Sequence, residues 1–338
     1  MRLFSAVIIP AVLMVVSAVS CEHGFAVRPF EPVADGRPVY NAVCYGPHRD
    51  GQRPGGIQPS AEELLEDLRL MLPHWKLMRV YGSSEFAGTL LEVIRENDLD
   101  MKVMLGVWID PEERRDDTGE LLERFDEAAA KNLREVDAAV RLANEYHGIV
   151  VAVSVGNESL IFWSDHRVPL DMLMGHVRRV REGVDVPVTV ADDFNYWNKP
   201  ESRELASQID FITLHAHPMW NGLQVEDALA WQRELLGDVQ AMHPDRLVVI
   251  GETGWATSVI DEGQQGELIK GKPGEEEQRL FYEAVRGWAE SEQRIVFFFE
   301  AFDENWKGGT NPAEVEKHWG LFRADRSAKA AMSGAAGG

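Results

Sequence analysis

The chain has 338 residues, and its 45% hydrophobic content with 10 Trp, 14 Phe and 6 Tyr is that of a globular protein with a sizeable core. Its formal net charge of -22 comes from 56 acidic against 34 basic residues. Because no cluster of Lys and Arg is present to neutralise a row of phosphates, we expect no nucleic-acid partner.

The beginning of the chain predicts export. Residues 1–20 join Arg2 to an apolar run that ends in small residues, which is typical of a secretory signal peptide. The run continues into Ala18-Val-Ser-Cys21, which resembles the lipobox of bacterial lipoproteins, whose Cys is lipidated. We therefore expect an exported lipoprotein, anchored through Cys21 in the cell envelope, at the outer membrane or in the periplasm. Alternatively, Cys21 pairs with Cys44, although Cys44 lies in an apolar stretch where buried thiols are common.

The remaining sequence divides into a tether, one large domain and a tail. Residues 21–38 contain several Pro and Gly residues and predict a lipidated N-terminus followed by a short tether. Residues 327–338 are rich in Ala, Gly and Ser and predict a disordered tail. No segment after the signal has the roughly 18 consecutive apolar residues of a membrane span.

Residues 39–326 alternate short apolar runs with longer amphipathic segments, the pattern of strand–helix repeats with a parallel sheet. We therefore predict a single-domain α/β fold, a (β/α)8 TIM barrel. The predicted strands are Val39–Tyr45, Lys76–Tyr81, Met101–Trp108, Ile149–Val155, Val186–Ala191, Ile209–His215, Leu247–Gly251 and Arg294–Glu300.

The segments between these strands predict helices with one apolar and one charged face. Ser60 and Glu63 have the spacing of a capping box and precede an apolar stripe from Leu64 to Leu72. Residues 121–143 and 280–288 repeat the amphipathic pattern, so we interpret their charged residues as solvated outer faces.

Three glutamates follow apolar strands directly, where a barrel of this kind builds its active site. Glu158 follows the fourth predicted strand, Glu252 the seventh, and Glu300 ends the eighth. Because a carboxylate at the end of an apolar strand is costly unless paired or protonated, three such residues indicate a functional site. Two facing carboxyl groups suit glycoside hydrolysis, in which one protonates the leaving oxygen and the other attacks the anomeric carbon.

Two motifs make this interpretation specific. Ser154-Val-Gly-Asn-Glu158 and Gly251-Glu-Thr-Gly-Trp255 resemble the acid/base and nucleophile motifs of glycoside hydrolase family 17. Cys44-Tyr-Gly-Pro47, Met78-Arg-Val-Tyr81 and Phe299-Glu-Ala-Phe-Asp-Glu-Asn-Trp-Lys307 extend the resemblance over most of the mature chain, and they are most similar to the bacterial branch of that family.

The resemblance implies a retaining enzyme acting on β-1,3-glucan through a covalent intermediate, with Glu252 as nucleophile, Glu158 as acid/base and no cofactor. It also implies that Glu304 and Lys307 support the catalytic centre and that Glu300 contacts sugar hydroxyls. Aromatic residues just past strands are candidates for stacking on sugar rings. The residues expected to bind substrate are Tyr45, Arg79, Tyr81, Asn157, His215, Trp220, Trp255, Glu300, Glu304, Trp306 and Lys307.

Other interpretations remain open at this stage. An endo-acting hydrolase and a β-1,3-glucanosyltransferase share the same covalent intermediate, and the motifs do not separate them. A lipoprotein that binds glucan without cleaving it would keep the same cleft. A metal-dependent hydrolase would use His215 and His217 with partners such as Asp192 and Asp193, but a fuller set of strand-end ligands is not evident.

Overall fold

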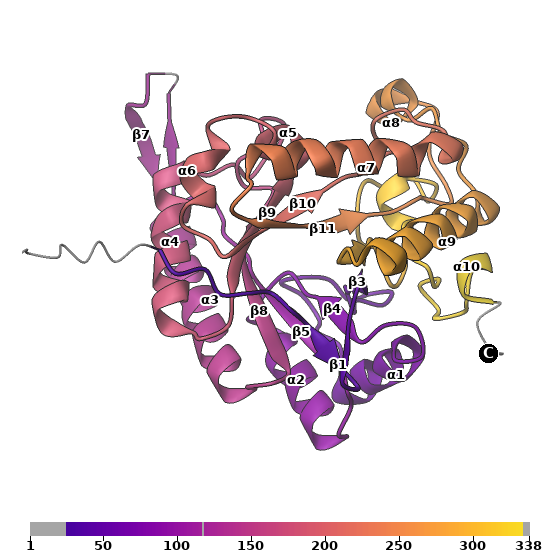
Figure 1. Ribbon diagram of the computed structural model, residues 1–338, viewed down its shortest axis with the longest axis horizontal. Helices are drawn as coiled ribbons and strands as arrows, with labels where there is room; N and C mark the ends of the chain where they lie inside the picture. Colours follow the sequence, from indigo (N-terminus) through magenta and orange to yellow (C-terminus); the bar gives the residue numbers. More distant parts are fainter. Residues whose placement is uncertain (1–24, 117, 334–338) are drawn as a thin grey trace, which may run out of the picture.

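The computed structural model describes residues 25–116 and 118–333 (Figure 1). The expected signal peptide, Cys21 and the last five residues, 334–338, lie outside the described residues. Within the described ranges, no helix is both long and apolar enough to cross a lipid bilayer.

Parallel strands close into an eight-stranded barrel at the centre of the molecule, which confirms the predicted (β/α)8 architecture (Figure 1). Every predicted strand is present, with its ends shifted by a few residues. Around the barrel the strands are β3 (Asn41–Cys44), β4 (Leu77–Arg79), β5 (Lys102–Val107), β8 (Val150–Asn157), β9 (Val188–Asp193), β10 (Phe211–His215), β11 (Leu247–Thr253) and β12 (Val296–Phe298), which pairs again with β3.

The barrel interior is a packed core. Successive side chains of a strand point to opposite faces, so alternate residues fill the barrel and their neighbours face the helices. The interior cluster includes Ala42, Cys44, Leu77, Met104, Ala152, Phe211, Val249 and Phe297. Because both faces of each strand are buried, the strands read as nearly continuous apolar runs in the sequence.

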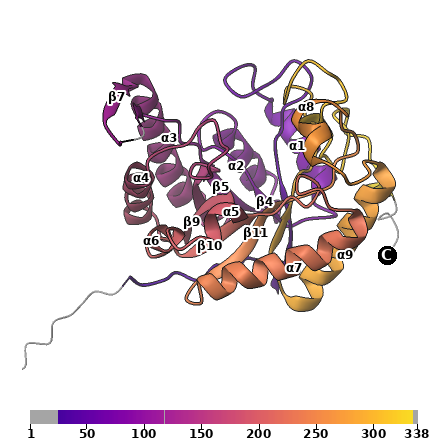
Figure 2. The same ribbon diagram turned by 90° about the horizontal axis from the view of Figure 1, so that it is seen from above.

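Helices surround the barrel (Figure 2). The capping box of the first one is confirmed: the Glu63 amide donates to Ser60 Oγ, and the Ser60 amide donates to Glu63 Oε2. The longer helices are α1 (Ala61–Met71), α2 (Ala87–Glu96), α3 (Asp126–Glu145), α4 (Leu170–Gly183), α7 (Val225–Met242) and α9 (Glu275–Glu292). Shorter ones are α5 (Phe194–Trp197), α6 (Ser202–Ala206), α8 (Gly263–Leu268), η1 (Val315–Lys317) and α10 (Ala330–Ser333).

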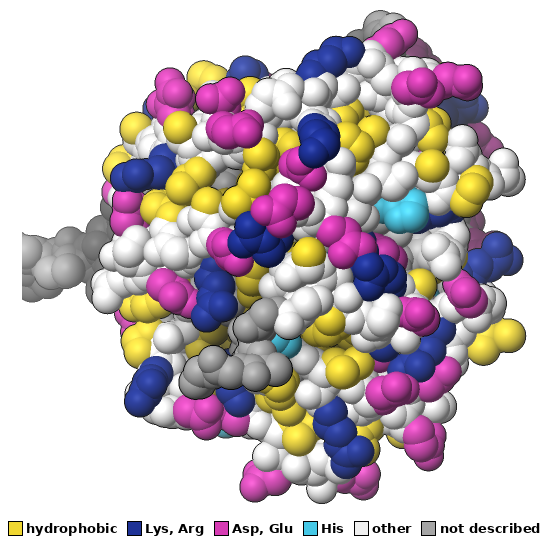
Figure 3. Space-filling model, turned by 90° about the vertical axis from the view of Figure 1, so that its right-hand side faces the viewer, with side chains coloured by type: hydrophobic (Ala, Val, Ile, Leu, Met, Phe, Trp, Pro, Cys, Tyr) yellow, Lys and Arg dark blue, Asp and Glu magenta, His cyan; other side chains and the backbone are white. Residues whose placement is uncertain are grey.

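The outer helix faces are charged, as expected. On α9, Arg279 bonds to both Glu276 and Glu283, and Arg286 bonds to Glu290. Figure 3 shows acidic and basic side chains interspersed over one side of the molecule. Exposed pairs of this kind contribute little to stability, so these charges mainly keep the surface solvated.

The prediction of one helix across residues 121–143 is wrong at its start. Residues 121–124 form strand β7 (Leu121–Arg124), which pairs antiparallel with β6 (Glu113–Arg115), and α3 begins only at Asp126. This hairpin extends beyond the helices (Figure 1). Leu121 and Leu122 fit the helical period of the following residues, but they are exposed on the hairpin.

The described part of the predicted tether, residues 25–38, packs against the barrel. Phe30 is buried and stacks on Phe211, the first residue of β10, with ring centroids 4.3 Å apart. The guanidinium of Arg28 donates to three backbone carbonyls near the end of α4 and before β9. Strands β1 (Val33–Ala34) and β2 (Arg37–Pro38) form a small hairpin. The Pro and Gly residues mark turns, and the sequence pattern gave no sign of this packing.

The predicted disordered tail is also corrected for residues 327–333. Lys329 is buried and donates to Asp303 Oδ1 at 2.8 Å, and α10 follows it. Just before this segment, Arg326 donates to both carboxylate oxygens of the buried Asp67 on α1. The Ala-, Gly- and Ser-rich composition of residues 327–338 therefore gave no sign of the buried pair between Lys329 and Asp303.

The Phe30 contact predicts a stability role for the N-terminal segment. Replacing Phe30 with Ala should lower the free energy of unfolding by about 3 kcal/mol or more, because a buried aromatic ring is lost at the bottom of the barrel. Denaturant unfolding measures this change. Val27→Ala, in the same segment but 44% exposed, is the control and should change stability by less than about 0.5 kcal/mol. Equal changes in the free energy of unfolding of the two variants would show that the Phe30 contact does not stabilise the barrel.

Candidate active site

Glu158 stands immediately after β8, where the strand is irregular. Ser154 pairs with Thr189 of β9, but Asn157 pairs with Ala191, so β8 has an extra residue that forms a bulge. Gly156 at φ 78° and Glu158 at φ 48° both lie in the left-handed region, which a non-glycine residue rarely adopts. The bulge redirects the Glu158 side chain, which is 19% exposed.

Glu252 lies within β11 and is also positioned by a bulge. Leu214 pairs with Ile250, but the next residue, His215, pairs with Glu252, so Gly251 is the extra residue. A Cβ atom at Gly251 would come within 2.1 Å of Thr213 Cγ2, so only glycine fits. The bulge and the glycine together bring Glu252 level with the end of β10.

The ring of His215 lies between the two glutamates. Its Nδ1 lies 3.0 Å from Glu158 Oε1, and its Nε2 lies 3.3 Å from Glu252 Oε1. An oxygen of Glu158 and an oxygen of Glu252 lie within 4.8 Å of each other. Arg79 Nη1 is 2.9 Å from His215 Nε2 and can only donate, so Nε2 accepts and the ring proton is on Nδ1, which donates to Glu158.

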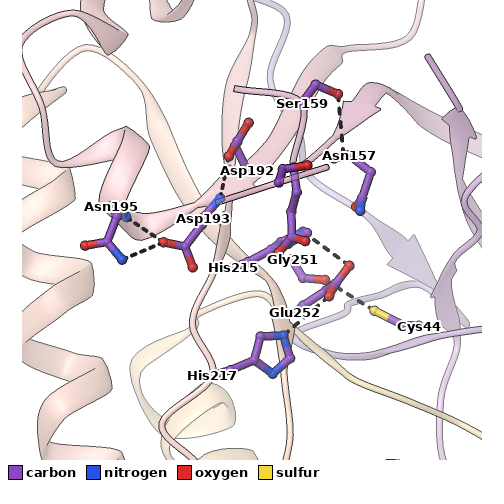
Figure 4. Close-up of polar contacts among 12 residues, drawn as sticks. Cys44, Asn157, Ser159, Asp192, Asp193, Asn195, His215, His217, Gly251 and Glu252 are labelled. Atoms are coloured by element: carbon purple, nitrogen blue, oxygen red, sulfur yellow. Dashed lines mark hydrogen bonds and ion pairs between the residues drawn. The ribbon is translucent and has the colours of Figure 1, made fainter. Parts of the chain in front are cut away.

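Glu252 receives several donors. Arg79 Nη1 donates to its Oε1 at 2.7 Å, and Tyr81 Oη donates to the same oxygen at 2.9 Å. His217 Nε2 lies 3.4 Å from Oε2, and Figure 4 shows its ring directed at Glu252. Arg79 also donates to Asn157 Oδ1 at 2.6 Å, which links the Glu252 side of the site to the residue before Glu158.

These surroundings drive the two carboxyl groups to opposite ionisation states. Burial raises the pKa of Glu158 well above its usual range, and the nearby negative charge of Glu252 raises it further. Burial also opposes ionisation of Glu252, but His215, His217 and Arg79 outweigh it and hold the pKa of that carboxyl well below its usual range. Burial lowers the pKa of His215 to about 3, so the ring acts on Glu252 by charge only in acid, where it is itself protonated. Near pH 7 the ring is neutral, and Arg79 supplies the permanent positive charge.

A second buried cluster lies after β12. Lys307 Nζ donates to Glu300 Oε2 at 2.7 Å and lies 2.9 Å from Glu304 Oε2. His48 and the indole of Trp306 contact Glu304 Oε1. Burial raises the pKa of Glu300 despite Lys307, whereas at Glu304 the nearby Lys307, His48 and Trp306 outweigh burial and lower the pKa. Lys307 therefore neutralises the charge of Glu304, whereas Glu300 favours its protonated form.

Comparison with known proteins identifies the family. The BtgE/BtgC glycoside hydrolase domain matches residues 42–320, which is most of the chain. The chain belongs to this family.

Curated relatives agree with this family. A protein named probable glucan endo-1,3-beta-glucosidase btgC, from Aspergillus clavatus, is 26% identical over 294 residues, covering 81% of this chain and 39% of that protein. A glucan 1,3-beta-glucosidase from Schizosaccharomyces pombe is 27% identical over 288 residues, covering 79% of each chain. The chain thus spans well under half the length of the first relative.

Solved structures of similar proteins share the fold of this chain. An endo-laminarinase from Formosa Hel1_33_131 superposes with a TM-score of 0.75 at 27% identity over 87% of both chains. A glycoside hydrolase family 17 β-1,3-glucanosyltransferase from Rhizomucor miehei shares the fold, with a TM-score of 0.67 at 20% identity over 86% of this chain and 95% of that one. The resemblance to glycoside hydrolase family 17 is confirmed, and the assignment to its bacterial branch stays a prediction.

Two of the predicted aromatic contacts are corrected by burial. Tyr45 is fully buried in this glycoside hydrolase domain, and its hydroxyl donates to Asp67 on α1. Trp255 is buried in the core, and its indole donates to the carbonyl of Lys272. Position after a strand therefore did not distinguish a ring that faces the cleft from one that packs under the loops.

The other predicted residues divide into two groups. Arg79, Tyr81, Asn157 and His215 surround the two catalytic candidates and hydrogen-bond to them or to one another. Glu300, Glu304, Trp306 and Lys307 form the cluster after β12, in which the Trp306 ring is 39% exposed. Glu300 is fully buried and pairs with Lys307, so its expected contact with sugar hydroxyls is corrected. Trp220 is half-buried against the core, with no polar contact to either group.

The sequence places His217 in the stretch His215-Ala-His-Pro-Met-Trp220, which is more plausibly part of the sugar cleft than a metal site, but it did not single out His217 as a site residue. The ring packs against Phe299 and Trp319, and contact with Glu252 helps to raise the pKa of His217 although burial opposes this. The signal was its spacing: His215 and His217 are two apart at a strand end, so both can approach the neighbouring strand.

The geometry disfavours the metal interpretation of this domain. Glu158, His215 and Glu252 have atoms close enough to hold an ion. However, the guanidinium of Arg79 already pairs with Glu252, where it would repel a metal cation. Asp192 accepts from the amides of Leu160 and Asp193, and Asp193 accepts from Asn195 (Figure 4), so these two carboxylates are engaged in fixing the loops after β8 and β9.

The charge arrangement predicts the effect of removing Arg79. In Arg79→Met the permanent cation beside Glu252 is lost, so the pKa of Glu252 should rise. Carbon NMR of protein labelled at the glutamate carboxyl carbons measures this titration, and Glu252→Gln assigns the signal. Arg134→Met, on the exposed face of α3, is the matched control and should leave the titration in place. An unchanged Glu252 titration in Arg79→Met would mean that the histidines alone keep this carboxyl ionised.

Proposed function

We propose that this protein is a retaining glycoside hydrolase that cleaves β-1,3-glucan, with Glu252 as nucleophile and Glu158 as acid/base. The observation that supports this most directly is a pair of carboxyl groups of opposite ionisation, linked through His215 and Arg79. A closest approach within 4.8 Å suits a retaining pair, whose carboxyl groups lie about 5–5.5 Å apart, better than an inverting pair at about 6.5–9.5 Å.

In the first step, Glu158 donates its proton to the glycosidic oxygen while a carboxylate oxygen of Glu252 attacks the anomeric carbon. The bond from that carbon to the leaving oxygen breaks, and an ester bond to Glu252 forms. Burial next to Glu252 keeps the proton on Glu158 before the reaction, and Arg79 and Tyr81 hold Glu252 in place for attack.

In the second step, Glu158 is the base. It takes a proton from water or from a sugar hydroxyl, whose oxygen attacks the anomeric carbon and releases Glu252. The Nδ1–H group of His215 donates to Glu158 Oε1, with the two heavy atoms 3.0 Å apart. This hydrogen bond stabilises the carboxylate that the first step leaves on Glu158. A neutral His215 thus supports both states of the acid/base without adding charge.

The substrate class rests on relatives and charge. The names of the similar proteins cite glucan 1,3-β-glucosidase, endo-1,3-β-glucosidase and laminarinase activity. A net charge of -22 also favours a neutral glucan over a polyanionic polymer. A capture protein without turnover would not need the opposed ionisation of Glu158 and Glu252, so we favour an enzyme.

Substitution of the two glutamates tests the roles. Glu252→Gln should lower kcat on laminari-oligosaccharides at least about 10³-fold, because the nucleophile is lost. Glu158→Gln should lower it about 10²–10⁴-fold and much less on a substrate with an activated aryl leaving group, which needs no proton. Glu226→Gln, on the exposed face of α7, is the control.

Mass spectrometry of products formed in ¹⁸O-labelled water gives the reaction type. Shorter, labelled products indicate hydrolysis, and longer, unlabelled ones indicate transfer to a sugar. Proton NMR of the first product should show the β-anomer. An α-anomer, or full activity in Glu252→Gln, would contradict the retaining assignment.

We also propose that Cys21 is lipidated and anchors the domain at the cell envelope, which the lipobox-like residues 18–21 support. A palmitate analogue supplied to a bacterial expression host should label the wild-type protein and Cys44→Ser, whose replaced thiol lies buried in the barrel, but not Cys21→Ser. Label retained in Cys21→Ser, or absent from the wild type, would contradict the proposal.

A further inference from the structure

The first described residues of the chain are held at the amino end of the barrel. The ring of Phe25 lies under two guanidinium groups, with Arg181 Cζ 3.9 Å and Arg246 Cζ 5.2 Å from the ring centroid. Arg181 also donates to the carbonyl of Ala26. Arg181 is in the last turn of α4, and Arg246 directly precedes β11, so both lie at the end of the barrel where the strands begin.

A buried carboxylate fixes the next residues at the same end. Asp210, directly before β10, accepts from the amide of Arg28 at 2.8 Å and from the Arg181 guanidinium at 2.9 Å. Its other oxygen accepts from the amide of Val188, the first residue of β9, at 2.8 Å. Hydrogen bonds to a charged group are stronger than those between neutral groups. Releasing the N-terminal segment would therefore break several strong contacts at once.

The chain between Cys21 and these contacts is short. Cys21 and Phe25 are four positions apart, and even a fully extended chain of that length spans at most about 14 Å. Strand β8, by comparison, has eight residues and ends beside Glu158. At a rise of about 3.3 Å per residue and a tilt of about 36°, such a strand separates the two ends of the barrel by roughly 20 Å. A group attached to Cys21 therefore stays near the amino end.

Figure 2 shows these two ends of the molecule. The N-terminal segment enters at the lower left, near α6, whereas β7 and α8 lie at the top of the view. Along the chain, β7 follows β5 and α8 follows β11, so both are at the carboxyl ends of the strands, with Glu158 and Glu252. The point where the chain reaches the domain is thus opposite the candidate active site.

We propose that the amino end of the barrel faces the membrane that holds the lipid on Cys21, and that the catalytic end points away from the bilayer. This proposal rests on the lipidation of Cys21 proposed above. With the catalytic end against the bilayer, Phe25 would be roughly 20 Å or more from the membrane surface, farther than the connection to Cys21 can span. The loops before β9, β10 and β11 lie next to the lipid headgroups instead.

This orientation determines how substrate reaches the anchored enzyme. The active site at the carboxyl ends of the strands opens to the aqueous compartment, so a glucan chain approaches without displacing lipid. The short connection also restricts rotation of the domain, so the cleft keeps its direction while the protein diffuses in the membrane. The lipid therefore orients the enzyme as well as holding it.

Fluorescence quenching at the membrane surface tests the orientation. Full-length lipidated protein is bound to phosphatidylcholine vesicles in which part of the lipid carries a nitroxide on its headgroup, a quencher that acts only at short range. Ser207→Cys places a fluorophore after α6, at the amino end, and Thr310→Cys places one after β12, at the catalytic end. Both positions are exposed, whereas Cys44 is buried and stays unlabelled. The Ser207→Cys label should lose most of its fluorescence, and the Thr310→Cys label should keep it.

A longer connection between lipid and domain is the matched control. An insertion of about 20 Gly and Ser residues between His23 and Gly24 makes the connection flexible, so the difference between the two labels should shrink. Cys21→Ser, which removes the attachment point, should leave both labels unquenched.

The outcomes separate the orientation from the proposals on which it depends. Equal quenching of both labels, or stronger quenching of the Thr310→Cys label, would overturn the orientation and leave the lipidation of Cys21 standing. A wild-type protein that does not bind the vesicles would contradict the lipidation, and the orientation with it. Cleavage of laminari-oligosaccharides, measured on the same protein in detergent, tests the proposed enzyme independently of both.

Discussion

Two like charges close together are the constraint on which this site depends. Within 4.8 Å of each other, two ionised carboxylates repel by at least about 3.5 kcal/mol at an effective dielectric of about 20. The protein resolves this by surrounding Glu252 with Arg79, Tyr81 and His217, so that it keeps the charge, while Glu158 keeps the proton. His215 lies between them and must stay neutral, because a charged ring would favour ionisation of both.

This arrangement places demands on the backbone of three strands. Glu158 directly follows β8, Glu252 lies in β11, and His215 ends β10, which pairs with β11. Regular pairing would not bring their side chains to one point. The bulges at Gly156 and Gly251 supply the missing offset, and Gly251 is required because Thr213 leaves no room for a Cβ atom. The barrel contributes a rigid frame, and the bulges aim the side chains within it.

The two ends of the barrel differ in how much apolar surface they bury. Phe30 and the segment around it pack at the amino ends of the strands, and Arg326 and Lys329 hold the end of the domain through the buried Asp67 and Asp303. At the carboxyl ends, by contrast, the loops carry the exposed rings Phe162, Trp163 and Trp306. Apolar surface is thus buried at one end of the barrel and partly exposed at the other.

The sequence by itself determined the barrel and the positions of Glu158 and Glu252, because strand periodicity and strand-end carboxylates are local patterns. Tertiary structure alone decided which side chains are buried: Tyr45 and Trp255 follow strands as Tyr81 does, yet they bond to Asp67 and to Lys272 inside the protein. It also decided that residues 25–38 and 327–333 pack against the barrel, and that His217 reaches Glu252. Burial and ionisation depend on neighbours distant in the chain, and those neighbours are fixed only when the barrel closes.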